Sequence, residues 1–225
     1  MGHKLYDYGG FSLSRLNEPR FSHLKLLGAW LIYFALYFLT ENLIPADICH
    51  VIGCALDDKI PFCEGFVIIY AGWYIFVAGS LAYTVFYNVE GFIQIQKFIM
   101  ISQFLAMLCY IFYPSIQLLR PEEFPRHNVL TELLGFIYAF DTPTGVCPSL
   151  HAAYSIGITS AALKDKYLNT GWKAGAVVFT LLVCCAVCFV KQHSVIDVLM
   201  ALPVCLIAEI IVHGSYYKAK KRVST

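Results

Sequence analysis

Two apolar runs follow each other in residues Trp172–His213, which read WKAGAVVFTLLVCCAVCFVKQHSVIDVLMALPVCLIAEIIVH. Each run approaches the ~20 residues that an α-helix needs to cross the hydrocarbon core of a bilayer. Similar runs recur along the chain, which is 59% apolar and only 14% charged. A soluble domain has a charged fraction of about 25%. The sequence therefore predicts an all-α integral membrane protein.

We expect six transmembrane helices in a single membrane-embedded domain that covers residues 1–225. The fourth predicted span is the shortest, and it would reach both membrane surfaces by tilting or by local thinning of the bilayer. We find no internal repeat and no low-complexity linker. The six spans lie at about 24–44, 65–87, 92–113, 146–163, 172–190 and 194–213.

The basic residues predict the orientation of this bundle. With both termini in the cytoplasm, the outer side holds Lys59, Arg120, Arg126 and Lys191. The other 12 of the 16 Lys and Arg residues then lie inside or at the inner interface. This asymmetry follows the positive-inside rule. No basic stretch with interleaved aromatic residues indicates a nucleic-acid partner, and the oligomeric state is left open.

The nine cysteines carry little functional information. Most lie inside predicted spans, where a thiol commonly serves as a small apolar filler. Cys49 and Cys63 share the first outer loop and could form a disulfide if that face is oxidising. We find neither the ligand spacing of a zinc site nor a glycine-rich phosphate loop, so we expect no metal and no cofactor.

The first informative cluster is Cys147-Pro148-Ser149-Leu150-His151, at the start of the fourth span. A proline at the first helical position leaves the helix N-terminus open. The amides of Ser149 and Leu150 would then face outward, where a helix end binds phosphate readily. The Ser149 hydroxyl adds a donor, and His151 lies one turn inside. The alternative is an ordinary helix start whose histidine bonds to a neighbouring carbonyl.

The second cluster joins the fifth and sixth spans and runs from Lys191 to Asp197. His193 and Asp197 are four residues apart, so they share a helix face and can touch. A carboxylate on one imidazole nitrogen makes the other nitrogen a better base or nucleophile. An aspartate within a span is costly and needs a partner. The alternative is a purely structural pair that holds two helices together.

Topology brings these two clusters to one face of the membrane. The fourth span enters from outside at His151, and the fifth leaves on the same side at His193. The outer loop before the fourth span adds Arg120-Pro121. The Arg120 guanidinium can grip phosphate oxygens in a bidentate fork, although a lone solvated arginine is equally compatible. The other charges of that loop are expected to be solvated, namely Glu122, Glu123, Arg126, His127 and Asp141.

These residues resemble the type-2 phosphatidic acid phosphatase superfamily of membrane enzymes. The resemblance lies in Pro148-Ser149-Leu150-His151, in His193 with Asp197, and in the upstream Arg120-Pro121 pair. It covers residues 113–203 in motif and the six-span plan over the whole chain. It implies that His193 attacks phosphorus, that Asp197 supports His193, and that His151 protonates the leaving oxygen.

The chain departs from the family's phosphatase pattern at two cations. Tyr113 stands where the family has a lysine, and Ala186-Val187 stand where it has a Ser-Arg pair. Lys191 is a candidate substitute for one of them. A phosphomonoester carries about two negative charges near neutral pH, so fewer cations suit a phosphodiester better. The sphingomyelin and inositol-phosphorylceramide synthases are similar in having an altered cation set, which keeps headgroup transfer open.

The expected chemistry is a two-step phosphoryl transfer on a lipid. His193 would attack phosphorus while Asp197 stabilises the imidazolium. The substrate oxygens would be held by Arg120, Lys191 and the amides at Ser149 and Leu150. His151 would act as acid and then as base for water or an acceptor hydroxyl. The non-enzymatic alternative is a small transporter, but transporters tend to show paired repeats and a polar midplane. The acidic first loop, with Asp47, Asp57, Asp58 and Glu64, could belong to a substrate entrance.

Overall fold

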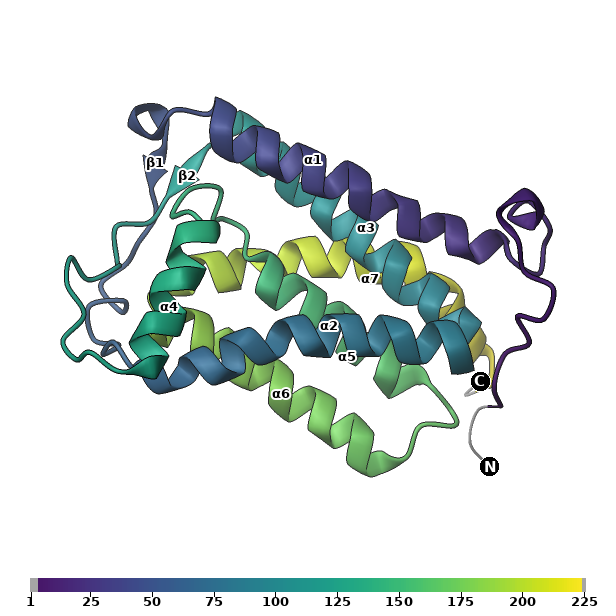
Figure 1. The fold of residues 1–225 in the computed structure, drawn as a ribbon. Helices are drawn as coiled ribbons and strands as arrows, with labels where there is room; N and C mark the ends of the chain where they lie inside the picture. Colours follow the sequence, from purple (N-terminus) through teal and green to yellow (C-terminus); the bar gives the residue numbers. More distant parts are fainter. Residues whose placement is uncertain (1–3, 224–225) are drawn as a thin grey trace.

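The computed structural model describes residues 4–223 and is a bundle of long helices (Figure 1). The first three and last two residues of the expected domain lie outside this part of the chain. The helices are α1 (Gly28–Leu43), α2 (Val67–Tyr87), α3 (Val89–Phe112), α4 (Val129–Phe140), α5 (Leu150–Lys164), α6 (Thr170–Phe189) and α7 (Val195–Val223). Short 3-10 turns lie at Leu13–Arg15, Ser22–Leu27, Ala46–Ile48 and Glu64–Phe66. The two-residue strands β1 (His50–Val51) and β2 (Ser115–Ile116) pair in parallel and join the loop after α1 to the loop after α3.

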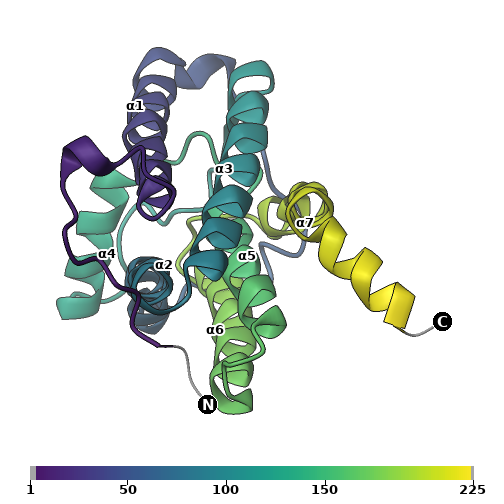
Figure 2. The same cartoon turned by 90° about the vertical axis from the view of Figure 1, so that its right-hand side faces the viewer.

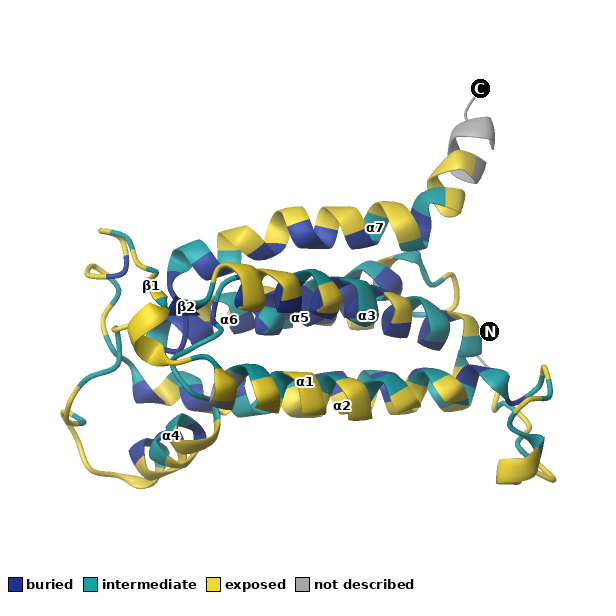
Figure 3. Cartoon of the chain, turned by 90° about the horizontal axis from the view of Figure 1, so that it is seen from above, coloured by how far each residue is buried: buried dark blue, intermediate teal, exposed yellow. Residues whose placement is uncertain are grey.

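In the described part of the chain, five helical stretches are long and apolar enough to cross a membrane. Their outward faces carry large apolar side chains, and the inward faces are buried (Figure 3). This pattern is that of a multi-pass membrane protein, because only lipid can cover so much apolar surface on the outside of a bundle. The five stretches are Ser22–Thr40, Glu64–Tyr87, Val89–Phe112, Thr170–Phe189 and Val195–Lys218.

The short helix α5 lies in the middle of the bundle rather than at its surface (Figure 2). It packs against α2, α3, α6 and α7. Its 15 residues rise about 22 Å at 1.5 Å per residue, which is less than the ~30 Å of a bilayer core. Its neighbours shield it, so its short length leaves little backbone facing lipid. Close packing is possible because Gly157 lies against the Phe98 ring, where an added Cβ would come within 2.4 Å of the ring.

The helix α4 was not expected from the sequence. It begins at an Asn128 capping box and packs against α2 with Leu134 and Ile137, while Phe136 and Phe140 remain exposed. With 12 residues it is too short to span a membrane. It crosses one end of the bundle (Figure 1). Its C-cap, Asp141, belongs to the site described below.

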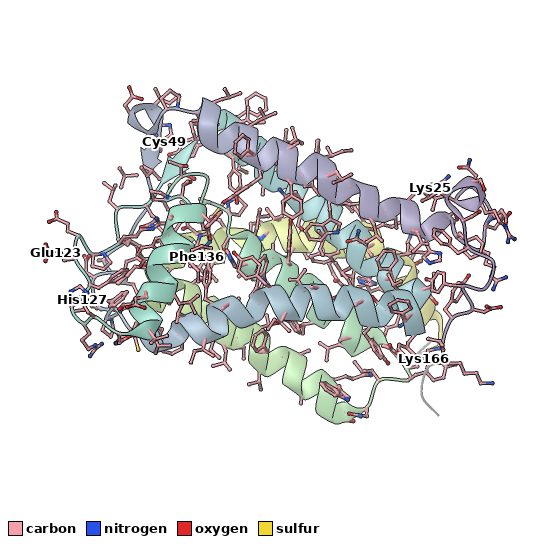
Figure 4. The ribbon with its side chains drawn as sticks, viewed as in Figure 1. Lys25, Cys49, Glu123, His127, Phe136 and Lys166 are labelled. Atoms are coloured by element: carbon pink, nitrogen blue, oxygen red, sulfur yellow. The ribbon has the colours of Figure 1, made fainter. Side chains whose placement is uncertain are left out.

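The two ends of the bundle carry different loops (Figure 4). Cys49, Glu123, His127 and Phe136 lie at one end, with α4 and the two strands. Lys25 and Lys166 lie at the opposite end, near the chain termini. Both histidine-bearing clusters belong to the first of these ends, because α5 begins there and α6 ends there.

Candidate active site

The structure brings His151 and His193 into contact. His151 lies in the first turn of α5, and His193 lies in the turn between α6 and α7. Nδ1 of His151 is 3.3 Å from Nε2 of His193. Both side chains are buried, at 8% and 7% exposure. The shared location that topology predicted is therefore present.

Asp197 supports His193 from the other side of the imidazole ring. Its Oδ2 lies 3.2 Å from Nδ1 of His193 and accepts a 2.9 Å hydrogen bond from the amide of Ser194. Asp197 is completely buried. A neutral His193 with its proton on Nδ1 donates to this carboxylate, which leaves the Nε2 lone pair directed at His151. The geometry thus pairs one nitrogen of His193 with a buried carboxylate and leaves the other facing His151.

The start of α5 differs from the expected phosphate-binding helix end. Helix α5 begins at Leu150 with Ser149 as its cap, so Pro148 precedes the cap instead of occupying the first helical position. Ser149 is extended and fully buried, its hydroxyl accepts from the Ala152 amide, and its own amide donates to the Asp197 carbonyl at 2.9 Å. Ser149 therefore ties α5 to α7, whereas Leu150 lines the neighbouring cavity.

Arg120 lies next to the site and contacts the residues around it. Its guanidinium donates to the backbone carbonyls of Tyr138 and Asp141 and to the side-chain oxygen of Gln192. It also stacks over the Tyr138 ring. Burial lowers the pKa of Arg120, although the surrounding tyrosines and Asp141 act in the opposite direction. Arg120 does not line the cavity, so in this structure it braces Asp141 and Gln192, which do.

Lys191 points away from the two histidines. Its backbone is left-handed, with φ of 55°. Its Nζ donates to the carbonyls of Asp57 at 2.8 Å and Ile60 at 2.6 Å, both in the loop between α1 and α2. The structure therefore does not bring Lys191 together with His151 and His193 as a group that faces substrate.

The sequence did not identify Asp141 or Asp57 as residues of the site. Asp141 was expected to be solvated, and this is wrong, because it accepts hydrogen bonds from Tyr70 and Tyr37. Its Oδ2 lies 4.0 Å from Nε2 of His151. The usable signal was its position directly after the apolar run that forms α4. Asp57 is buried beneath the turn that carries His193.

Other loop charges and the cysteines take simple roles. Arg126 is exposed, as expected, and it also pairs with Glu64 through a bidentate contact at 2.7 and 2.6 Å. All nine cysteines are free thiols, so Cys49 and Cys63 form no disulfide. Burial raises the pKa of the Cys147 thiol to about 12, with a further contribution from Asp197. A thiol with such a pKa is a poor nucleophile near neutral pH.

A partly open cavity of about 560 Å³ leads away from the two histidines. Its polar end holds His151, His193, Asp141 and Gln192. The rest is mostly apolar and aromatic, and none of its lining residues is Lys or Arg. Along α2 it extends from Trp73 to Leu81, a length of about 12 Å. The apolar lining also includes Trp30, Phe34, Val77 and Tyr154.

The cavity opens on the lipid-facing side of the bundle. Phe34 of α1 and Tyr74 of α2 both line it, yet they are 64% and 50% exposed. Helix α1 packs against α3, and the cavity lies between α1 and α2. A molecule with an apolar chain could therefore place that chain between these helices and its polar group at the histidines. Comparison with known proteins gave no match to any family model, curated protein or solved structure.

Proposed function

We propose that this chain is an integral membrane enzyme that hydrolyses a phosphomonoester or pyrophosphate on a lipid through a phosphohistidine formed on His193. The observation that carries the proposal is the linear arrangement of Asp197, His193 and His151 at the polar end of an apolar cavity. The resemblance of the motifs to the type-2 phosphatidic acid phosphatase superfamily supports the same chemistry.

In the proposed first step, Nε2 of His193 attacks phosphorus and the bond from phosphorus to the leaving oxygen breaks. Asp197 stabilises the imidazolium that forms. His151 donates a proton to the departing oxygen. Because His151 and His193 now touch at 3.3 Å, substrate binding must separate them to admit the phosphoryl group. Water then attacks phosphohistidine with His151 as base, which restores both side chains.

Headgroup transfer is the second candidate, and the cavity lining favours it. Arg120 and Lys191 are both bonded to backbone carbonyls, and the lining contains no Lys or Arg. A phosphomonoester with two negative charges would then meet little positive charge in the cavity. A phosphodiester carries one negative charge and needs less positive charge to bind. In this version the hydroxyl of a lipid alcohol, instead of water, attacks phosphohistidine.

The two candidates differ in their products. Purified protein would be incubated with vesicles that contain phosphatidic acid, with or without a lipid alcohol, and with phosphodiester lipids in parallel. We expect release of inorganic phosphate from the monoester, and we expect His193→Ala to abolish it. Lipid products would be followed by mass spectrometry. Phosphate at background on every monoester, together with headgroup exchange onto the alcohol, would replace hydrolysis by transfer.

We also propose six spans with both termini in the cytoplasm, which places the site on the extracytoplasmic face. This orientation is supported by the distribution of basic residues along the sequence. A short epitope inserted after Glu123 should bind antibody on intact cells, and one inserted after Lys166 should bind only after permeabilisation. These two residues lie at opposite ends of the bundle (Figure 4). Detection of the Lys166 epitope, and not the Glu123 epitope, on intact cells would reverse the orientation.

A further inference from the structure

The turn that carries His193 depends on contacts from outside itself. Within the turn, the amides of Gln192 and His193 both donate to the Val187 carbonyl, at 2.9 and 3.0 Å. The left-handed Lys191 precedes them. These hydrogen bonds are local to the turn, and the contacts that tie it to the rest of the protein come from other segments.

The loop between α1 and α2 supplies such contacts through the carboxylate of Asp57. Oδ1 of Asp57 accepts from the amide of Val195 at 2.9 Å, and Oδ2 accepts from the hydroxyl of Ser194 at 2.7 Å. The Cys54 amide also donates to Oδ2, at 2.7 Å. Val195 is the first residue of α7, so Asp57 provides a cap and a negative charge at the N-terminus of this helix from a segment far away in sequence.

Lys191 forms the reciprocal half of the same contact. Its ammonium group reaches back to the carbonyls of Asp57 and Ile60. Asp57 and Lys191 are 2% and 9% exposed. Burial raises the pKa of the Asp57 carboxyl, but hydrogen bonds from Ser194, Val195 and Cys54 outweigh this and leave the pKa below its ordinary value. Each segment thus holds the other through a buried charged group.

Ser194 connects this contact to the proposed nucleophile. Its hydroxyl donates to Asp57, while its amide donates to Oδ2 of Asp197, the oxygen that faces His193. We infer that Asp57 is a positioning residue, which with Lys191 holds Ser194 and thereby aligns Asp197 and His193 for attack. This inference rests on the proposed function. It assigns a role in the reaction to the loop between α1 and α2.

The test compares Asp57→Asn and Asp57→Ala with Asp58→Asn, a change at the exposed neighbouring aspartate. A misalignment of about 1 Å can cost ~10²-fold in rate. We therefore expect kcat and the single-turnover rate of phosphohistidine formation to fall by about 10²-fold in Asp57→Ala, and by less in Asp57→Asn, which keeps one acceptor oxygen. KM should stay within about twofold, because Asp57 does not line the cavity. Asp58→Asn should match the unchanged chain.

Ser194→Ala and Lys191→Met break the same contact from the other side and cover the case in which Asp57→Ala fails to fold. Both should lower kcat without raising KM. A folded Asp57→Asn or Ser194→Ala that forms phosphohistidine at the unchanged rate would overturn the inference, and so would a loss confined to KM or to melting temperature. If the unchanged chain forms no phosphohistidine on any lipid phosphate or aryl phosphate, the proposed function fails first and is identified as the failure.

Discussion

His151→Ala should lower turnover of a lipid phosphate by ~10²–10⁴-fold, the usual loss when a general acid is removed. The same variant should still react once with p-nitrophenyl phosphate. An alkoxide leaves poorly at neutral pH without a proton, whereas nitrophenolate leaves with little help. The result would be a burst of nitrophenol followed by a stalled enzyme, because the base for the second step is also gone. Stopped-flow absorbance together with acid-labile protein phosphate measures both steps.

Removal of His193 should have a different signature. His193→Ala has no nucleophile, so it should show no burst on either substrate and no acid-labile phosphate. The matched control is His127→Ala, because His127 is an exposed loop histidine at the same end of the bundle (Figure 4) and should behave as the unchanged chain. A burst from His193→Ala but not from His151→Ala would exchange the two roles. Full activity in both variants would place the chemistry elsewhere.

Much of the bundle could be predicted from apolar runs, because long apolar segments have few alternatives in a membrane protein. The spans expected at 65–87 and 172–190 correspond to α2 (Val67–Tyr87) and α6 (Thr170–Phe189). The ends were less predictable. The last span was expected to stop at residue 213, yet α7 runs to Val223, since no proline or glycine follows Gly214 to end it. Hydropathy records the apolar part of a helix, not its continuation into polar surroundings.

The fourth span and α4 show a second limit. The span expected from residue 146 begins as a helix only at Leu150, because the residues before the Ser149 cap are not helical. Helix α4 is not predicted by hydropathy, because it is short and only one of its faces is buried. With 12 residues, this apolar helix falls short of the ~20-residue run that identifies a span.

The candidate site also contains residues that the sequence predicts and residues that it does not. His193 and Asp197 were predictable because an i, i+4 spacing on a helix fixes their proximity, and the span count placed His151 beside them. The hydrogen-bond partners of Arg120 and Lys191 were not predictable, because a long charged side chain can reach several different acceptors. Both end on backbone carbonyls. The hydrogen-bond partners of Asp57 and Asp141 are far from them along the chain, so no local pattern identifies those partners.

Asp197→Asn should slow formation of phosphohistidine by about 10⁴-fold, the loss observed when the carboxylate of an Asp–His pair becomes an amide. Oδ2 of Asp197 serves both the Ser194 amide and Nδ1 of His193. In Asp197→Asn the atom at this position is either the amide oxygen, a neutral acceptor that stabilises the imidazolium less than a carboxylate does, or the NH₂ group, which faces Nδ1 and leaves the Ser194 amide without an acceptor. In the second arrangement His193 would carry its proton on Nε2, so the lone pair needed for attack is lost; in the first, the imidazolium formed by attack loses its carboxylate partner.

This variant should differ from His151→Ala in one decisive respect. The lipid phosphate and the aryl phosphate should be slowed alike, because attack by His193 precedes departure of either leaving group. The amide removes a buried charge and keeps the shape of the side chain, so we expect the melting temperature to change little. Glu122→Gln, at an exposed carboxylate in the outer loop, is the matched control and should leave the burst unchanged. If Asp197→Asn shows the unchanged burst rate on the aryl ester, then Asp197 acts after phosphohistidine has formed, and its role is to support the second step.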